Sequence, residues 1–88
     1  ERHEAVCLKN ALDSAGELFK NGVRNAVELI AEMKQTIGEY DLARIDYISI
    51  VDNELLQPIA QIDRPTLVAL AVYLGNTRLI DNMVLIPS

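Results

Sequence analysis

The sequence has little of what builds disulfides, metal sites and aromatic platforms. Its 88 residues include one cysteine, one histidine and no tryptophan, and aromatic residues make up 5%. The single cysteine, Cys7, excludes an internal disulfide. The chain also lacks a signal-peptide pattern and an apolar run long enough to span a bilayer, so we expect a cytoplasmic protein in a reducing setting.

Positive charge is scarce as well. Eight lysines and arginines stand against 13 aspartates and glutamates, which gives a formal net charge of -5. Such a chain repels phosphate backbones and anionic headgroups on average, so we expect neither a nucleic-acid nor a membrane partner. Hydrophobic residues are abundant at 50%, which predicts one domain, residues 1–88, with a modest core. Because the sequence begins at Glu1 without methionine, in a helical pattern, we expect a piece of a longer protein.

The first half of the chain has helical periodicity. Apolar residues recur at the i, i+3, i+4 spacing over residues 8–19 and again over 26–37. Asn21-Gly22 indicates the end of the first helix, and Asn25 with Glu28 three residues later indicates the start of the second. The short connection predicts an antiparallel two-helix hairpin.

After Asp41 the hydrophobic period changes to two. Strands are predicted over Arg44–Asp52, over Thr66–Leu74 and, after Gly75-Asn76, from Thr77 onward. The second strand is apolar on both faces, which favours the centre of the sheet. The prolines between the first two strands predict an irregular, packed crossover that holds Leu55, Leu56, Ile59 and Ile62. The predicted fold class is α+β: an N-terminal two-helix hairpin packed on a small three-stranded antiparallel sheet.

The Gly75-Asn76 turn predicts the register of the last two strands. If Leu74 pairs with Thr77, Asp81 lies on the bulkier apolar face, which we expect to form the core beneath the helices. Such a carboxylate must find donors, take up a proton or lie at the margin of the sheet, and the first N–H groups of the second helix or Arg44 would supply donors. Asp81 is therefore a candidate structural anchor between sheet and helices.

Other polar residues have no evident partner for chemistry. His3 is the only histidine and lies among Arg2 and Glu4 at the start of the chain, so we expect it to face solvent. Asp46 and Asp52 lie about 20 Å apart on an extended strand, which makes a strand charge and a turn aspartate better interpretations than a shared magnesium ion. Cys7 flanks the first apolar stripe, as an inert, partly buried thiol would. No catalytic, cofactor-binding or metal-binding residue is expected.

Four segments together carry a family resemblance. "RIDYISIVD", "LQPIAQI", the apolar strand and "LGNTRLIDN", in this order and spacing, resemble the C-terminal domain of the pantoate-beta-alanine ligase family. The upstream "GVRNAVELIAEM" also resembles that family's helical segment. The likeness covers nearly the whole chain.

The resemblance implies a ligase of pantothenate biosynthesis, on the pathway to coenzyme A. It implies that ATP and pantoate form pantoyl adenylate, that beta-alanine attacks it, and that AMP and diphosphate leave with magnesium assistance. It places the nucleotide site in an N-terminal Rossmann-like catalytic domain outside this sequence, and it implies a homodimer. The present chain would be a hinged lid, inactive alone.

A lid needs a surface that docks on its partner domain. The sheet face opposite Asp81 carries Tyr73, Arg78 and Asn82, which are candidates for interdomain docking. The alternative is that Arg78 stacks over Tyr73 or pairs with a carboxylate of this domain. The competing function is a free-standing, non-catalytic protein-interaction module with the same two-helix, three-strand build, and the length of the gene distinguishes the two.

Overall fold

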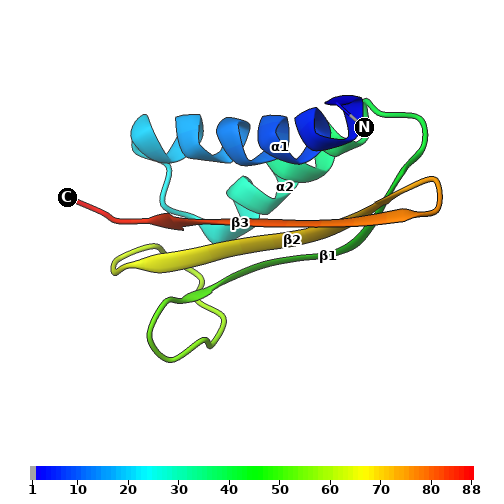
Figure 1. Ribbon diagram of the computed structural model, residues 1–88. Coiled ribbons are helices and arrows are strands. Elements are labelled where there is room, and N and C mark those ends of the chain that lie inside the picture. The colour runs from blue at the N-terminus through cyan, green and yellow to red at the C-terminus, as the bar shows by residue number, and fades with distance from the viewer. Residues whose placement is uncertain (1) are drawn as a thin grey trace.

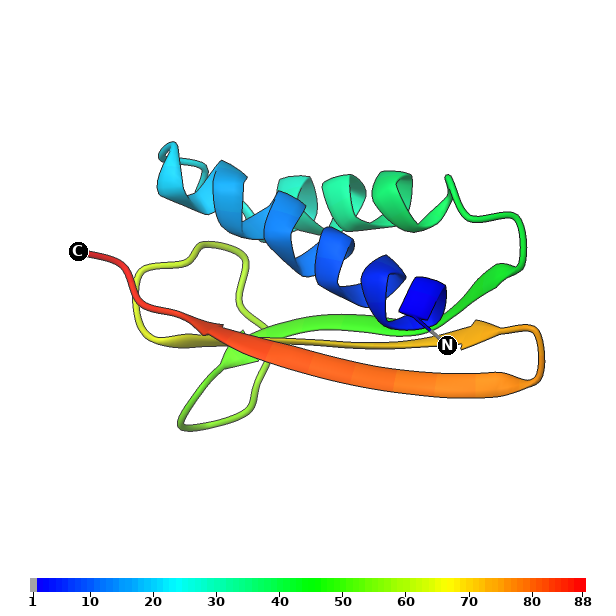
Figure 2. The same ribbon diagram turned by 45° about the horizontal axis from the view of Figure 1, so that its top comes forward.

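Two helices cover one face of a three-stranded sheet. A computed structural model describes residues 2–88, with side chains from Val6 onward. The elements in chain order are α1 (Arg2–Lys20), α2 (Ala26–Ile37), β1 (Ala43–Asp52), β2 (Thr66–Leu74) and β3 (Thr77–Leu85). Figures 1 and 2 show both helices on the same side of the sheet, so that the opposite side carries no helix. The predicted α+β class and two-helix, three-strand order are confirmed.

The helix ends follow the predicted signals. Gly22 has a φ of 103°, and the Val23 and Gly22 amides donate to the Leu18 and Phe19 carbonyls at 2.9 and 3.0 Å. These bonds close α1 with a Schellman motif, which the glycine allows at little steric cost. Asn25 caps α2, because its side-chain oxygen accepts a 3.2 Å hydrogen bond from the Glu28 amide.

The sheet is an antiparallel meander in the order β1-β2-β3. β2 is the central strand, as predicted from its apolar faces. The predicted β2–β3 register is confirmed from Leu74–Thr77 through Ala69–Asn82. Gly75 has a φ of 61°, which suits the first turn position of a type II′ hairpin. In β1, the pairing with β2 shifts at Asp46, where one residue bulges out of the ladder.

The connection between β1 and β2 differs from the prediction. It joins neighbouring antiparallel strands and so is a long hairpin connection, not a crossover. Ile62 is buried and Ile59 packs against the core, as expected. The prediction is wrong for Leu55 and Leu56, which are 67% and 61% exposed, because the chain turns away from the sheet directly after Asp52.

The core lies between the helices and the helix side of the sheet. Its fully buried large side chains come from α2, from the β1–β2 connection and from β2, namely Leu29, Met33, Ile37, Ile62, Val68, Leu70 and Val72. Cys7 is fully buried among them, deeper than predicted, and burial raises the pKa of its thiol. An inert thiol is the expected result of that burial.

We expect Leu29→Ala to destabilise the chain by about 2 to 5 kcal/mol, because it leaves a cavity at the helix–sheet interface. Val27 is two residues earlier on α2 and is 71% exposed, so Val27→Ala is the matched control, expected within about 0.5 kcal/mol of the parent. Urea denaturation followed by circular dichroism measures both. Equal losses in the two variants would contradict the placement of α2.

Candidate functional site

The candidate docking residues lie together on the helix-free side of the sheet. We call this surface the open face and define it by strand alternation and register as Tyr47, Ala69, Ala71, Tyr73, Arg78, Ile80, Asn82 and Val84. Its neighbours on alternate positions, Val68, Leu70 and Val72, belong to the core cluster. The structure therefore brings Tyr73, Arg78 and Asn82 onto one surface, as the register predicts.

An ion pair spans the open face across the central strand. Arg78 on β3 donates from Nε and Nη2 to Oδ2 of Asp46 on β1, at 3.0 and 2.8 Å. Asp46 is the residue that bulges out of β1. The hydrogen bond from Arg78 to Asp46 raises the pKa of Arg78. Both side chains remain over one third exposed, so water screens the pair. Of the predicted alternatives within the domain, pairing with a carboxylate is the one that forms.

Tyr73 is covered by a different arginine from the one predicted. The guanidinium carbon of Arg44 lies 4.6 Å from the Tyr73 ring centroid, in the range of a cation–π contact. Arg44 is directly opposite Tyr73 in the β1–β2 register, whereas Arg78 is opposite Tyr73 on the other side. The two arginines thus flank the tyrosine, and each has its own partner.

The centre of the open face is apolar. Ala71 is fully buried, although it lies on the side without helices and outside the core cluster. Its register partners are Tyr47 on β1 and Ile80 on β3, and Ile80 is 57% exposed. Small alanines on the central strand, flanked by larger exposed side chains, form an apolar strip between the two edge strands.

Asp81 does not occupy the predicted buried position. The register places it opposite Leu70, on the helix side, but the residue is exposed. Its carboxylate accepts a 2.8 Å hydrogen bond from the Asn82 amide, while Asn25 caps α2 and Arg44 stacks on Tyr73. The prediction of a buried Asp81 is wrong, because the parity of a strand position specifies the side of the sheet but not the depth of burial. The anchor role assumed a buried carboxylate, so the exposed position of Asp81 does not support it.

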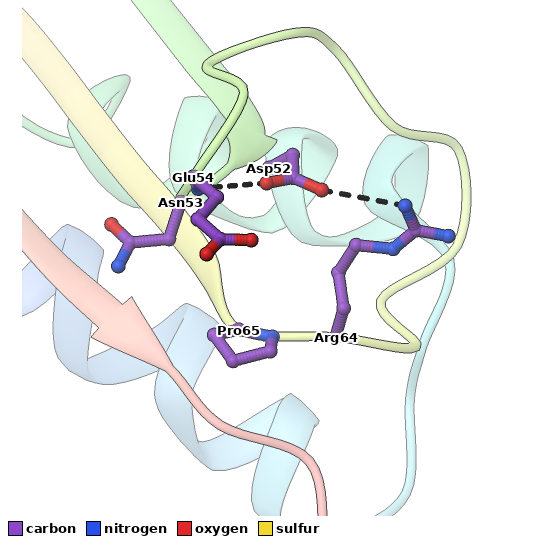
Figure 3. A pocket seen from close by; sticks show the side chains of 5 residues that line it. All are labelled: Asp52, Asn53, Glu54, Arg64 and Pro65. Carbon is purple, nitrogen blue, oxygen red and sulfur yellow. Dashed lines mark hydrogen bonds and ion pairs between the residues drawn. The ribbon is translucent and has the colours of Figure 1, made fainter.

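A shallow hollow of about 300 Å³ lies where β1 ends. Asp52, Asn53, Glu54, Arg64 and Pro65 line it (Figure 3). Oδ1 of the buried Asp52 accepts hydrogen bonds from the Glu54 and Leu55 amides at 2.7 and 2.9 Å, and Oδ2 lies 3.3 Å from Nη1 of Arg64. The prediction of a turn aspartate is confirmed.

These contacts lower the pKa of Asp52. The backbone amides of Leu55 and Glu54 are the largest causes, and Arg64 adds to them. Arg64 also pairs with Asp63 at 2.8 Å, so its charge is shared between two carboxylates. The hollow is thus a turn held by hydrogen bonds to Asp52. Arg64, the cation that lines it, is already paired with carboxylates.

The described residues form neither a three-ligand metal cluster nor a group of unpaired arginines. No three His, Cys, Asp or Glu side chains from Val6 onward lie close enough together to hold a metal ion. The four arginines after Arg2 are engaged within the domain, with Arg24 donating to the Phe19 carbonyl at 2.6 Å. Phosphate groups would therefore find no free guanidinium cluster here. His3, with Arg2 and Glu4, lies outside the residues whose side chains are described.

No helix within residues 2–88 combines the length and apolarity that crossing a bilayer requires.

Comparison with known proteins gives one consistent result. The family model described as pantoate-beta-alanine ligase matches residues 1–84. A pantothenate synthetase of Thermotoga petrophila is 44% identical over 97% of this chain and 30% of its own length, and one of Thermosipho africanus is 47% identical over the same shares. The crystal structure of pantothenate synthetase from Thermus thermophilus superimposes with a TM-score of 0.83 at 27% identity, over 93% of this chain and 29% of that one. The chain spans about 30% of the length of these relatives.

Several features of the site were not predicted from the sequence. The Asp52–Arg64 contact joins residues 12 positions apart through an irregular connection whose path no periodicity specifies. The exposed Leu55 and Leu56 were expected in the core because apolar residues usually pack inward. A signal was present, because Asp52-Asn53 is a turn dipeptide and an aspartate that caps its own turn directs the next residues outward.

We expect acid to remove the Asp52 contribution to stability. Because the folded-state pKa of Asp52 lies below its ordinary value of 3.8, these contacts stabilise the fold fully above that value and are lost as the pH falls through the folded-state pKa. The urea midpoint of Asp52→Asn should therefore lie below that of the parent near neutral pH, with the gap narrowing below about pH 4.

Arg64→Gln is the matched control. It removes the ion pair but keeps both backbone donors, so its midpoint should fall less than that of Asp52→Asn at neutral pH. A gap between Asp52→Asn and the parent that stays constant down to about pH 2 would show that the carboxylate charge is not what stabilises this turn.

Proposed function

The chain belongs to the pantoate-beta-alanine ligase family, and from that premise we propose that it is the C-terminal lid domain of a larger ATP-dependent ligase. The observation that carries the proposal is the coverage. Nearly the whole chain matches, yet it matches under one third of each relative's length. A domain of this kind contributes a surface and a movement rather than the reacting groups.

The reaction we propose for the whole protein condenses pantoate with beta-alanine through pantoyl adenylate and releases AMP and diphosphate. We place ATP and magnesium in the N-terminal catalytic domain, because the residues described here include no cluster of three metal-ligating side chains. The whole protein would be a cytoplasmic homodimer that pairs mainly through that other domain. This chain alone would be inactive, and its contribution would be to keep water away while the adenylate exists.

The open face is the surface that we propose docks on the catalytic domain. It is the side of the sheet without helices, and its apolar strip around Ala71 lies between Tyr73, Arg78 and Asn82. Tyrosine and arginine are enriched in protein interfaces because each combines a large contact area with directional hydrogen bonds. The loop that follows β1 projects on the same side (Figure 1), and it carries the exposed Leu55 and Leu56.

Variants of the Arg78–Asp46 pair can distinguish a docking role of Arg78 from a role within the domain. If Arg78 acts only within the domain, Asp46→Asn and Arg78→Ala remove the same contact and should have the same effect. If Arg78 docks, Asp46→Asn leaves its guanidinium available to the partner domain. The free-standing interaction module remains the competing function, and the greater length of the relatives favours the lid.

We expect Arg78→Ala combined with Asn82→Ala to lower kcat/KM of the full-length ligase about tenfold or more, since an interface contact is worth roughly 1 to 2 kcal/mol. Asp46→Asn should stay near the parental value. Lys9→Ala on the helix surface is the control for a generic loss of charge, because Lys9 pairs only with the exposed Asp13. Normal turnover in the double variant, or equal losses of kcat/KM in Arg78→Ala and Asp46→Asn, would contradict the docking role.

We also expect the isolated 88-residue chain to show no calorimetric heat of binding with ATP or with pantoate at ligand concentrations up to about 1 mM, where a Kd of 1 mM corresponds to only about 4 kcal/mol. The physical reason is that every described arginine already has a partner. Titration of the full-length ligase under the same conditions is the positive control. Micromolar binding to the isolated chain would place the substrate site within these residues.

A further inference from the structure

The two edges of the sheet are protected in different ways. Along β1, the connection to β2 folds back onto the outer edge: the Asp52 amide donates to the Gln57 carbonyl at 2.8 Å, and Val51 bridges to Pro58. The bulge at Asp46 lies in the pairing of the same strand with β2. β3 pairs only with β2 among the described strands, so its outer edge is not paired with a strand over nine residues, and α1 packs against its helix side. An unpaired edge of that length is a template for another strand.

The hairpin register shows which groups β3 presents. In a two-residue hairpin the residues that flank the turn bond to each other, so Thr77 and every second residue after it direct their N–H and C=O groups toward β2. Arg78, Ile80, Asn82 and Val84 direct theirs outward. The amide that Asp81 binds at 2.8 Å is that of Asn82, so the carboxylate occupies a donor on the free edge.

A second copy of this chain fits the edge with Asp81 at its centre. β3 runs from Thr77 to Leu85, and an antiparallel pair of two such strands overlaps fully only when residue 81 faces residue 81. In that register Leu79 of one copy faces Met83 of the other, and the outward residues can exchange hydrogen bonds along the whole strand. The two Asp81 carboxylates would meet in a non-hydrogen-bonded pair, where strands approach to about 4.5 Å between Cα atoms.

We propose that the free edge of β3 is a strand-pairing surface for a second copy of this chain, and that Asp81 keeps it closed. The carboxylate does so twice, by occupying the Asn82 amide and by opposing its own copy across the symmetry axis. This role is independent of the proposed ligase function. It also explains why an aspartate lies between Leu79 and Met83 on the helix side of an edge strand.

Asp81→Val tests the proposal in the 88-residue chain. Valine removes the charge and the cap and suits an exposed strand, so the variant should fold, as circular dichroism verifies. Sedimentation equilibrium should give the parent mass of 9.8 kDa for the unchanged chain and twice that mass for the variant. Asp81→Lys should remain monomeric, because like charges again face each other. Asp41→Val, which makes the same change at an exposed residue outside the three strands, should also remain monomeric.

Hydrogen exchange locates the contact. In the Asp81→Val dimer the amides of Arg78, Ile80, Asn82 and Val84 should exchange at least about tenfold more slowly than in the parent. A monomeric Asp81→Val variant, a dimeric Asp81→Lys variant, or a dimer without this protection would each overturn the proposal. Dimerisation of Asp41→Val would overturn it too, because added hydrophobicity alone would then explain the association.

Asp81→Cys tests the register. Residue 81 should cross-link to its own copy under mild oxidation, since Cα atoms about 4.5 Å apart lie within the range of a disulfide. Cys7 is fully buried and does not compete. The control is Asp81→Val combined with Ile80→Cys, which should dimerise without cross-linking because residue 80 faces residue 82. Cross-linking of the control, or none at residue 81, would contradict the predicted alignment.

Discussion

The two-residue turn at Gly75-Asn76 fixes the registration of β3 on β2, and the positions of the polar residues on these two strands follow from it. A slip of one residue would move Leu79, Met83 and Leu85 off the helix side and put Arg78 and Asn82 beneath the helices. The turn holds because glycine adopts the positive φ of its first position without a steric penalty. One pair of residues thus separates a face that packs from a face that remains available to a partner.

Local signals in the sequence were sufficient for the framework. The helix ends followed from Asn21-Gly22 and Asn25, and the β2–β3 register followed from Gly75-Asn76, because each of these depends on neighbours within a few positions. The depth at which a side chain is buried was harder to predict. Asp81 lies on the predicted side of the sheet yet is exposed, and the depth of burial along a strand is not recorded by hydrophobic periodicity.

The contacts between distant segments were the other part that the sequence did not disclose. Arg78 reaches Asp46, 32 positions away, because a bulge occurs there in β1, and Arg44 takes the place over Tyr73. Both pairs are chemically ordinary, and several other arginine–carboxylate and arginine–tyrosine pairs were equally compatible with the sequence. Strand order and the bulge determine which of these pairs form, and both are tertiary properties.

The meander order of the sheet has a consequence for how such a domain comes into being. Each strand pairs with the next one along the chain, and the two helices precede them as a hairpin, so every pairing within a layer joins elements that are consecutive in sequence. Pairings between consecutive elements join residues at moderate separations along the chain, which favours rapid folding. Residues paired in this way tend to fold together as one unit. In the lid role that we propose, such a unit would move as one body.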